Sequence, residues 1–121
     1  MSYKRNILFL IAVSFLSAQF DWINDGAPIR QGQHIEWQRT ADKGADGEII
    51  FGWSDTREGM RDVYVQKVDA EGNKVWGENG LPVAQAFGRQ EDPLLVSDGA
   101  GGAFIIWIDY RSEPDTKGDV Y

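Results

Sequence analysis

Two Trp-x-Asp-x-Arg motifs hold the side chains of this chain with the clearest capacity for chemistry. Their residues are Trp53, Asp55 and Arg57 in the first motif, and Trp107, Asp109 and Arg111 in the second. In a β-strand, residues two positions apart project from the same face, so each carboxylate is placed to hold its guanidinium in a forked ion pair. Such a pair suits two roles. The arginine can bind an anionic sugar at a ligand-binding rim, or the pair can be a structural contact at a strand end, with the tryptophan packed beneath it.

We favour the structural role, because a catalytic site needs only one copy and this pair returns with a repeat. The same argument applies to the tryptophans, whose faces would suit sugar rings but whose positions repeat with the strands. We therefore predict six structural residues, no catalytic or cofactor-binding residue and no cofactor. The chain is expected not to be an enzyme.

The motifs belong to an internal repeat in which every matched pair has the same spacing as Trp53 and Trp107. Besides the motif residues, the matched pairs are Trp22 and Trp76, Gly26 and Gly80, Pro28 and Pro82, Gln31 and Gln85, and Gly47 and Gly101. The register then shifts, since Asp62-Val63-Tyr64 returns slightly later than this spacing requires, as Asp119-Val120-Tyr121. The extra residues of the second copy fall within 112–118, where we expect a surface turn.

The pattern within one period predicts only β-structure. The runs 48–53 and 103–108 are almost continuously apolar, as in inner strands covered on both faces. The stretch 62–69 alternates and predicts a half-exposed strand, followed by a turn at 70–73 and a short strand at 74–76. Another strand is expected at 92–97, before a glycine-rich turn at 98–102. Four short antiparallel strands per unit is the count of a propeller blade.

These motifs together resemble a known kind of repeat. The order Gly-Gly-x-x-x-x-Trp-x-Asp-x-Arg, then Asp-Val-Tyr-x-Gln-x-Val-Asp-x-x-Gly-x-x-x-Trp, then Gly-x-Pro-Val is similar to the blade-like repeats of secreted bacterial β-propeller-type surface proteins. The resemblance covers residues from about 22 to 121. It implies four-stranded antiparallel blades of about 54 residues in an incomplete propeller. The region 19–121 would then hold one full repeat and part of a second from a longer array. The chain is also faintly similar to the aspartate-box turn of sialidase-type propellers, but the Ser-x-Asp-x-Gly-x-x-Trp order of that turn is absent. We therefore assign no sialidase catalytic residue to this sequence.

The first residues have the features of a secretory signal peptide, which we place at 1–18. Lys4 and Arg5 precede an apolar run at 7–16, and the small residues Ser17 and Ala18 precede Gln19. The run is too short for the roughly 20 residues of a spanning helix, and no cysteine offers a lipid anchor. We therefore expect a mature N-terminus near Gln19, no membrane span after cleavage, and a secreted, periplasmic or cell-surface location.

The net charge of the mature chain argues against nucleic acid as a partner. The formal charge is −7, and loss of Lys4 and Arg5 makes it about −9, which repels nucleic acid. No cysteine is present, so stability must come from the core or from further repeats.

Metal and acid–base sites have weak support. Acidic residues near glycines suggest calcium ligands at Asp42, Asp46 and Glu48, or at Asp92 and Asp98. None of these stretches has the order of an EF-hand loop, and turn-forming aspartates are common in β-proteins. His34 is the only histidine, so neither a zinc site nor a histidine-based catalytic set is predicted.

Two classes of function remain. The first is an exported structural or binding module, part of a larger secreted or cell-surface protein, that presents loops such as 112–118 to a protein or polysaccharide. The second is the N-terminal part of a secreted glycan-active propeller enzyme whose catalytic residues lie outside this chain. Fewer than two full copies should leave an apolar face exposed, so we expect residues 19–121 alone to be marginally stable or self-associating.

Overall fold

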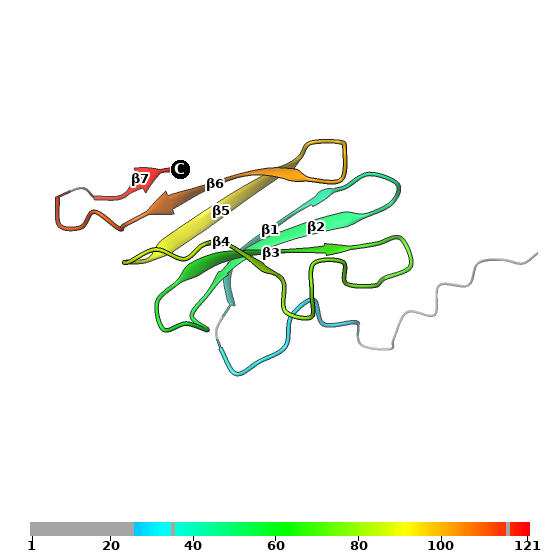
Figure 1. The fold of residues 1–121 in the computed structure, drawn as a ribbon, viewed down its shortest axis with the longest axis horizontal. Coiled ribbons are helices and arrows are strands. Elements are labelled where there is room, and N and C mark those ends of the chain that lie inside the picture. Colours follow the sequence, from blue (N-terminus) through cyan, green and yellow to red (C-terminus); the bar gives the residue numbers. More distant parts are fainter. Residues whose placement is uncertain (1–25, 35, 116) are drawn as a thin grey trace, which may run out of the picture.

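The computed structural model describes residues 26–34, 36–115 and 117–121, which form two antiparallel sheets and no helix. The first sheet has the order β1 (Glu36–Lys43), β2 (Ile49–Asp55), β3 (Asp62–Val68) and β4 (Leu81–Ala84). The second has the order β5 (Gln90–Ser97), β6 (Ala103–Asp109) and β7 (Asp119–Val120), as Figure 1 shows. The prediction of an all-β chain is thereby confirmed for these residues. The expected signal peptide at 1–18 lies outside them.

The repeat in the sequence is also a repeat in backbone geometry. Glu36 pairs with Asp55 in the first sheet, and Gln90 pairs with Asp109 at the equivalent place in the second. Each of these strand pairs is then interrupted by a bulge. The bulges contain Gln38 with φ 47° and Asp92 with φ 52°, an uncommon conformation for residues other than glycine. The extra residues of the second copy fall in the loop between β6 and β7.

Three strand predictions differ from the structure. The stretch 62–69 was expected to be half-exposed, but the first five residues of β3 are all buried, because β2 and β4 flank it and both faces are covered. The expected strand at 74–76 is only an isolated bridge between Lys74 and Val68, and the edge strand is β4 instead. Pro82 suits that edge because proline cannot donate a ladder hydrogen bond. The run 103–108 was expected to be covered on both faces, but alternate residues of β6 are exposed.

The core lies between the two sheets. Its buried centre is Ile50, Val65 and Leu95, with Ile105 and Ala103 packed against it. We call the face of the first sheet that is turned toward the second its front face; its residues are Thr40, Asp42, Ile50, Gly52, Val63 and Val65. The inner face of the second sheet consists of Leu95, Ala103 and Ile105.

Leu95 lies over Gly52 of the front face. A Cβ placed on Gly52 would be 3.5 Å from Leu95 Cδ1, an ordinary contact distance, and 3.0 Å from Thr40 Cγ2, which is tight. Leu95 thus packs directly over the backbone of Gly52.

Hydrogen bonds at the strand edges fix the position of the second sheet. The backbone N–H of Asp92 donates to Gln38 Oε1 at 3.2 Å, so the two equivalent bulges are bonded to each other. The N–H of Ser97 donates to Asp42 Oδ2 at 2.9 Å. As a result β5 packs beside β1 and β2, and the two first strands of the repeat lie next to each other (Figure 1).

Candidate functional site

The two Trp-x-Asp-x-Arg motifs form two compact clusters at equivalent ends of the sheets. In the first, Trp53 and Asp55 lie on the same face of β2, and Asp55 is its last residue. Arg57 lies beyond the strand, in the loop to β3. The expectation that both charged side chains project from one strand is therefore wrong for the arginine. The chain turns after Asp55, and the guanidinium reaches back to the carboxylate.

The carboxylate of Asp55 has no exposed surface and is satisfied by neighbouring donors. Trp53 Nε1 donates to Oδ2 at 2.8 Å. Arg57 Nε lies 2.9 and 3.0 Å from the two oxygens, and Nη2 lies 2.5 Å from Oδ2. The backbone N–H of Arg57 donates to Oδ1 at 3.1 Å. The predicted forked ion pair is thus present, and the indole N–H completes it.

The guanidinium of Arg57 is also held on its other sides. It lies 3.7 Å from the ring centre of Tyr64, which stacks on Trp53 with 6.2 Å between ring centroids. Arg57 Nη1 donates to the carbonyl of Asn79 at 2.9 Å, which ties the cluster to the residues before β4. Cation–π and charge-assisted contacts of this kind each stabilise the folded state.

The second cluster repeats these contacts. Trp107 Nε1 donates to Asp109 Oδ2 at 3.1 Å, and Arg111 donates from its backbone N at 2.9 Å and from Nη2 at 2.5 Å. Trp107 stacks on Tyr121 with 5.9 Å between centroids, and the Arg111 guanidinium lies 4.3 Å from that tyrosine ring. The tyrosines were not predicted as cluster members, although their place in the repeated Asp-Val-Tyr stretch is the signal that could have identified them.

The two clusters differ in how far solvent reaches them. The side chain of Arg57 is 15% exposed, whereas that of Arg111 is 37% exposed. Trp53 is buried but Trp107 is only partly buried. In the first cluster the segment before β4 supplies the Asn79 carbonyl and covers the indole, whereas the described part of the second sheet ends with β7 and Tyr121. The two Asp–Arg pairs therefore make matching contacts with tryptophan and tyrosine but differ in solvent exposure.

The residue opposite each aspartate also differs. Gln90 Nε2 donates to Asp109 Oδ1 at 3.4 Å. Its equivalent, Glu36, is instead paired with the buried Arg30, whose Nε lies 3.9 Å from Asp55 Oδ2. Arg30 was not singled out in the sequence, because its equivalent under the repeat is Ala84.

Both aspartates are held ionised. Burial acts to raise the pKa of Asp55, but hydrogen bonds from Arg57 and Trp53 outweigh it and place the pKa below its usual value. The hydrogen bond from Arg111 lowers the pKa of Asp109 to about 2. Neither carboxyl group holds a proton that it could donate at neutral pH, and every cluster contact described above is within the chain.

Asp62 has the opposite shift. It is buried and pairs across the strands with Asp55. Burial, together with the charges of Asp55 and Glu58, raises its pKa to about 6. The folded state therefore binds this proton more tightly than the unfolded state does, so the free energy of unfolding is expected to fall as pH rises from about 4 to about 6.

We expect Asp62→Asn to remove this part of the pH dependence. Urea unfolding should show the variant more stable than the parent at pH 7, by at most about 3 kcal/mol, and similar to it at pH 4. Asp115→Asn, which changes an exposed loop carboxylate, is the matched control and should leave the difference between the two pH values unchanged. Equal effects of Asp62→Asn at both pH values would contradict the raised pKa.

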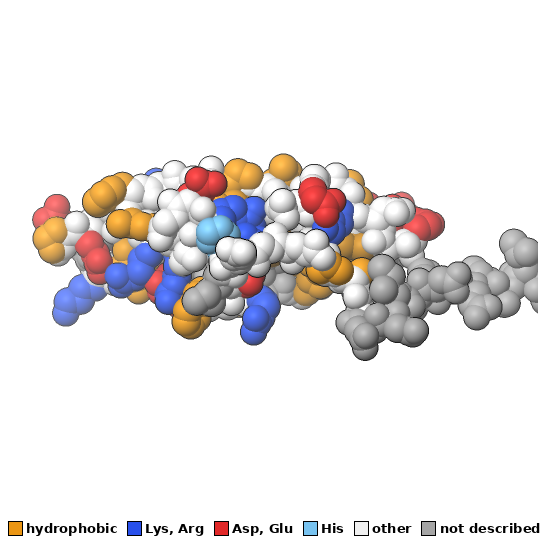
Figure 2. Space-filling view, turned by 90° about the horizontal axis from the view of Figure 1, so that it is seen from below, with side chains coloured by type: hydrophobic (Ala, Val, Ile, Leu, Met, Phe, Trp, Pro, Cys, Tyr) orange, Lys and Arg blue, Asp and Glu red, His pale blue; other side chains and the backbone are white. Residues whose placement is uncertain are grey.

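Of the calcium-ligand candidates, Asp42, Glu48 and Asp98 are engaged in structural contacts, whereas Asp46 and Asp92 are exposed. Asp98 Oδ1 accepts the backbone N–H groups of Ala100 and Gly102, as in an Asx turn, and Glu48 pairs with Lys67 at 2.9 Å. Within the described residues, no three His, Cys, Asp or Glu side chains are grouped to hold a metal ion. His34 is exposed. Acidic and basic side chains are mixed on the face that Figure 2 shows.

No helix within the described part of the chain is long and apolar enough to cross a membrane.

Comparison of the chain with protein-family models, with curated proteins and with solved structures finds no match.

Proposed function

We propose that this chain is an exported repeat module with a structural or binding role, belonging to a larger secreted or cell-surface protein. In this proposal its sheets are blade-like units of a β-propeller-type array, and the Trp–Asp–Arg clusters stabilise the units without catalysing a reaction. Export rests on the N-terminal sequence, and the blade assignment rests on the repeat and on the resemblance it supports.

The observation that carries the structural role is the use of the charged atoms inside each cluster. Both oxygens of Asp55 accept hydrogen bonds from the chain, and the Arg57 guanidinium is stacked on Tyr64 and bonded to Asn79. A ligand carboxylate would have to displace these contacts, at a cost in folding stability. The contacts among the tryptophan, aspartate, arginine and tyrosine recur in both copies, which is expected of a folding element and not of a single binding site.

Any partner would meet the loops and exposed faces of the module. The loop between β6 and β7 is longer than its counterpart in the first copy and is mostly exposed, so it is the segment we propose for contact with a protein or polysaccharide. The acidic mature chain does not suit nucleic acid.

A combined binding and stability measurement tests this proposal. The parent, Arg57→Ala and Arg111→Ala are compared by urea unfolding and on a glycan array that includes acidic sugars. We expect Arg57→Ala to lower stability strongly and Arg111→Ala weakly, with no acidic glycan bound through either arginine. If the parent bound an acidic glycan and Arg57→Ala lost this binding with an unchanged unfolding curve, Arg57 would belong to a ligand-binding rim and the structural role would be rejected.

A further inference from the structure

We propose that the outer face of the second sheet is a docking surface for a second copy of this chain, which binds through the back face of its first sheet. The outer face consists of Leu94, Val96, Phe104, Ile106, Ile108 and Val120. The back face of the first sheet is the one opposite its front face, and its accessible apolar part is Ala41, Ile49 and Phe51. A second copy would then be a partner of the repeat module proposed above, and this docking rests on the proposed function only in treating the sheets as stacking units.

The outer face is the repeat counterpart of a surface that is already covered within the molecule. In the repeat register, the front-face residues Thr40, Ile50 and Gly52 correspond to Leu94, Phe104 and Ile106 of the outer face. The front face is covered by the inner face of the second sheet, with Leu95 at its centre. The same register relates that inner face to the back face of the first sheet, because Leu95 corresponds to Ala41. The contact inside one molecule thus has a ready equivalent between two molecules.

The outer face is strongly apolar and accessible. Phe104 is 70% exposed, and Leu94 and Val96 are each 61% exposed. The equivalent positions in the first sheet include Asp42 and Ser54, which pairs with Val63 of the front face, so the second copy has Val96 and Ile108 in place of polar residues. A row of exposed apolar side chains on adjacent strands is typical of an interaction surface.

The residues that would meet between two molecules are complementary in size. Inside the molecule, the large Leu95 lies over Gly52. Between molecules in the same arrangement, the large Ile106 would lie over the small Ala41. The large and small partners are exchanged between the two faces, so the combined volume of the meeting side chains is roughly preserved.

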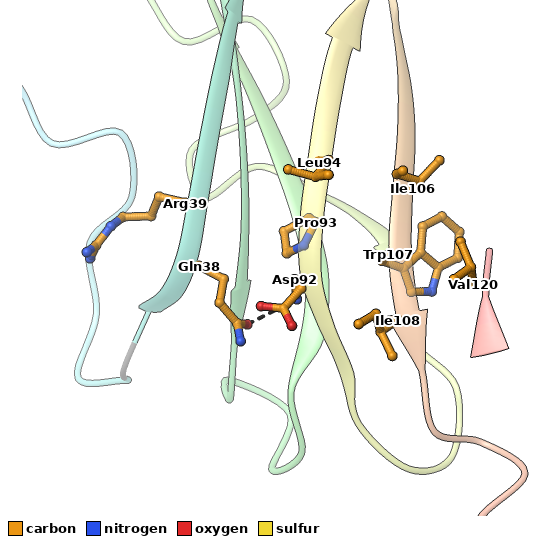
Figure 3. Close-up of a pocket in the computed structure, with 9 residues that line it drawn as sticks. All are labelled: Gln38, Arg39, Asp92, Pro93, Leu94, Ile106, Trp107, Ile108 and Val120. Carbon is orange, nitrogen blue, oxygen red and sulfur yellow. Dashed lines mark hydrogen bonds between the residues drawn. The ribbon is translucent and has the colours of Figure 1, made fainter. Parts of the chain in front are cut away.

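A groove at the bulge of β5 provides a polar contact for the same arrangement. It has a volume of about 520 Å³ and lies between the β1 residues Gln38 and Arg39 and the strands β5 to β7, as Figure 3 shows. Asp92 is exposed beside the groove. Within the molecule, Gln38 Oε1 accepts the backbone N–H of Asp92. In the intermolecular contact the Asp92 carboxylate takes the place of that oxygen and can accept the N–H of Gln38 from the second copy.

This contact joins two different faces, so each molecule keeps one face free after the first association. A heterologous contact of this kind grows into a ring or an open chain of molecules, whereas a face that pairs with itself stops at a dimer. The stoichiometry therefore distinguishes the two arrangements.

Sedimentation velocity over a concentration series of the full chain tests the two faces. The parent should associate beyond a dimer, and both Phe104→Asp on the outer face and Ile49→Asp on the back face should weaken association about tenfold or more. A mixture of the two variants should form a one-to-one complex, because each retains the face that the other has lost. Phe87→Asp introduces the same change at a loop residue that is 78% exposed and should behave as the parent.

Size complementarity is tested with Ala41→Leu and Ile106→Ala. These residues lie on separated faces of one molecule, so coupling between them reports the intermolecular contact. Ala41→Leu alone should weaken association, and addition of Ile106→Ala should restore it by about tenfold. Urea unfolding of dilute protein is recorded for each variant, which separates a failure of docking from a failure of the structural role of the clusters.

Three results would overturn the proposal. A parent that stays monomeric at all concentrations would mean that the outer face has no second copy to bind, including the case in which residues 1–25 cover it. Association that is lost in Phe104→Asp but unchanged in Ile49→Asp would point to a face that pairs with itself. If the effects of Ala41→Leu and Ile106→Ala on association were additive, the two residues would not be in contact between molecules.

Discussion

Asp55→Ala is expected to lower the free energy of unfolding by about 3–5 kcal/mol, measured by urea denaturation at pH 7. The substitution removes the one carboxylate that accepts from both Trp53 and Arg57, and it leaves their N–H groups and the guanidinium charge in a mostly buried place. Arg57→Ala should cost less, because Asp55 keeps the indole donor and lies near Arg30. The double variant should cost less than the sum of the single variants, since the two residues act as one pair.

The second cluster supplies the internal control for this prediction. Asp109→Ala is also expected to destabilise, because its carboxylate has no exposed surface, but Arg111→Ala should cost about 1 kcal/mol or less because solvent reaches that guanidinium. Trp53→Phe keeps an aromatic ring but removes the indole N–H together with the buried five-membered ring, so its cost should exceed that of one hydrogen bond to a charged group, about 1.5–3 kcal/mol. An Asp55→Ala variant with the stability of the parent would mean that the cluster does not support the fold.

Leu95→Ala is expected to lower the free energy of unfolding by about 3 kcal/mol, within the 2–5 kcal/mol typical of buried leucines. Leu95 is 6% exposed and lies over Gly52 at the centre of the contact between the sheets, so truncation leaves a cavity that the rigid strands cannot fill. Leu94→Ala is the matched control, since the neighbouring leucine is 61% exposed on the outer face. In dilute protein it should change stability by less than about 0.5 kcal/mol. Similar losses of stability for the two variants would contradict the assignment of Leu95, and not Leu94, to the buried face of β5.

The sequence predicts the repeat, the strands β2, β5 and β6, and the forked Asp–Arg contact, because each depends on residues close together in the chain or on a constant spacing. The recurrence of Trp53 as Trp107 is visible without a structure, and an apolar run such as 103–108 is a strand by its composition. The features that the sequence does not predict are those that depend on which face of a strand is covered by another element. The burial of β3, the exposure of Phe104 and the stacking of Arg57 on Tyr64 all depend on contacts made across the sheets.

Asp62 shows the same limit for charge. Its alternating context marks an ordinary strand residue, and the raised pKa arises only because the strand pairing sets it opposite Asp55 in a buried position. Likewise, β4 could not be placed from the sequence because Pro82 argues against a central strand, and only the structure shows that this strand is the edge.

Every strand in either sheet is hydrogen-bonded to the next one along the chain, and this sequential order has a consequence for how the chain folds. Each within-sheet pairing closes only a short loop, so its entropic cost is small, whereas the contact between the bulges at Gln38 and Asp92 closes a much longer one. We therefore expect the hairpins of each sheet to form early and the docking of β5 on the front face to come late. On this route Leu95 gains its partners only after the rate-limiting barrier, and its truncation should speed unfolding much more than it slows folding.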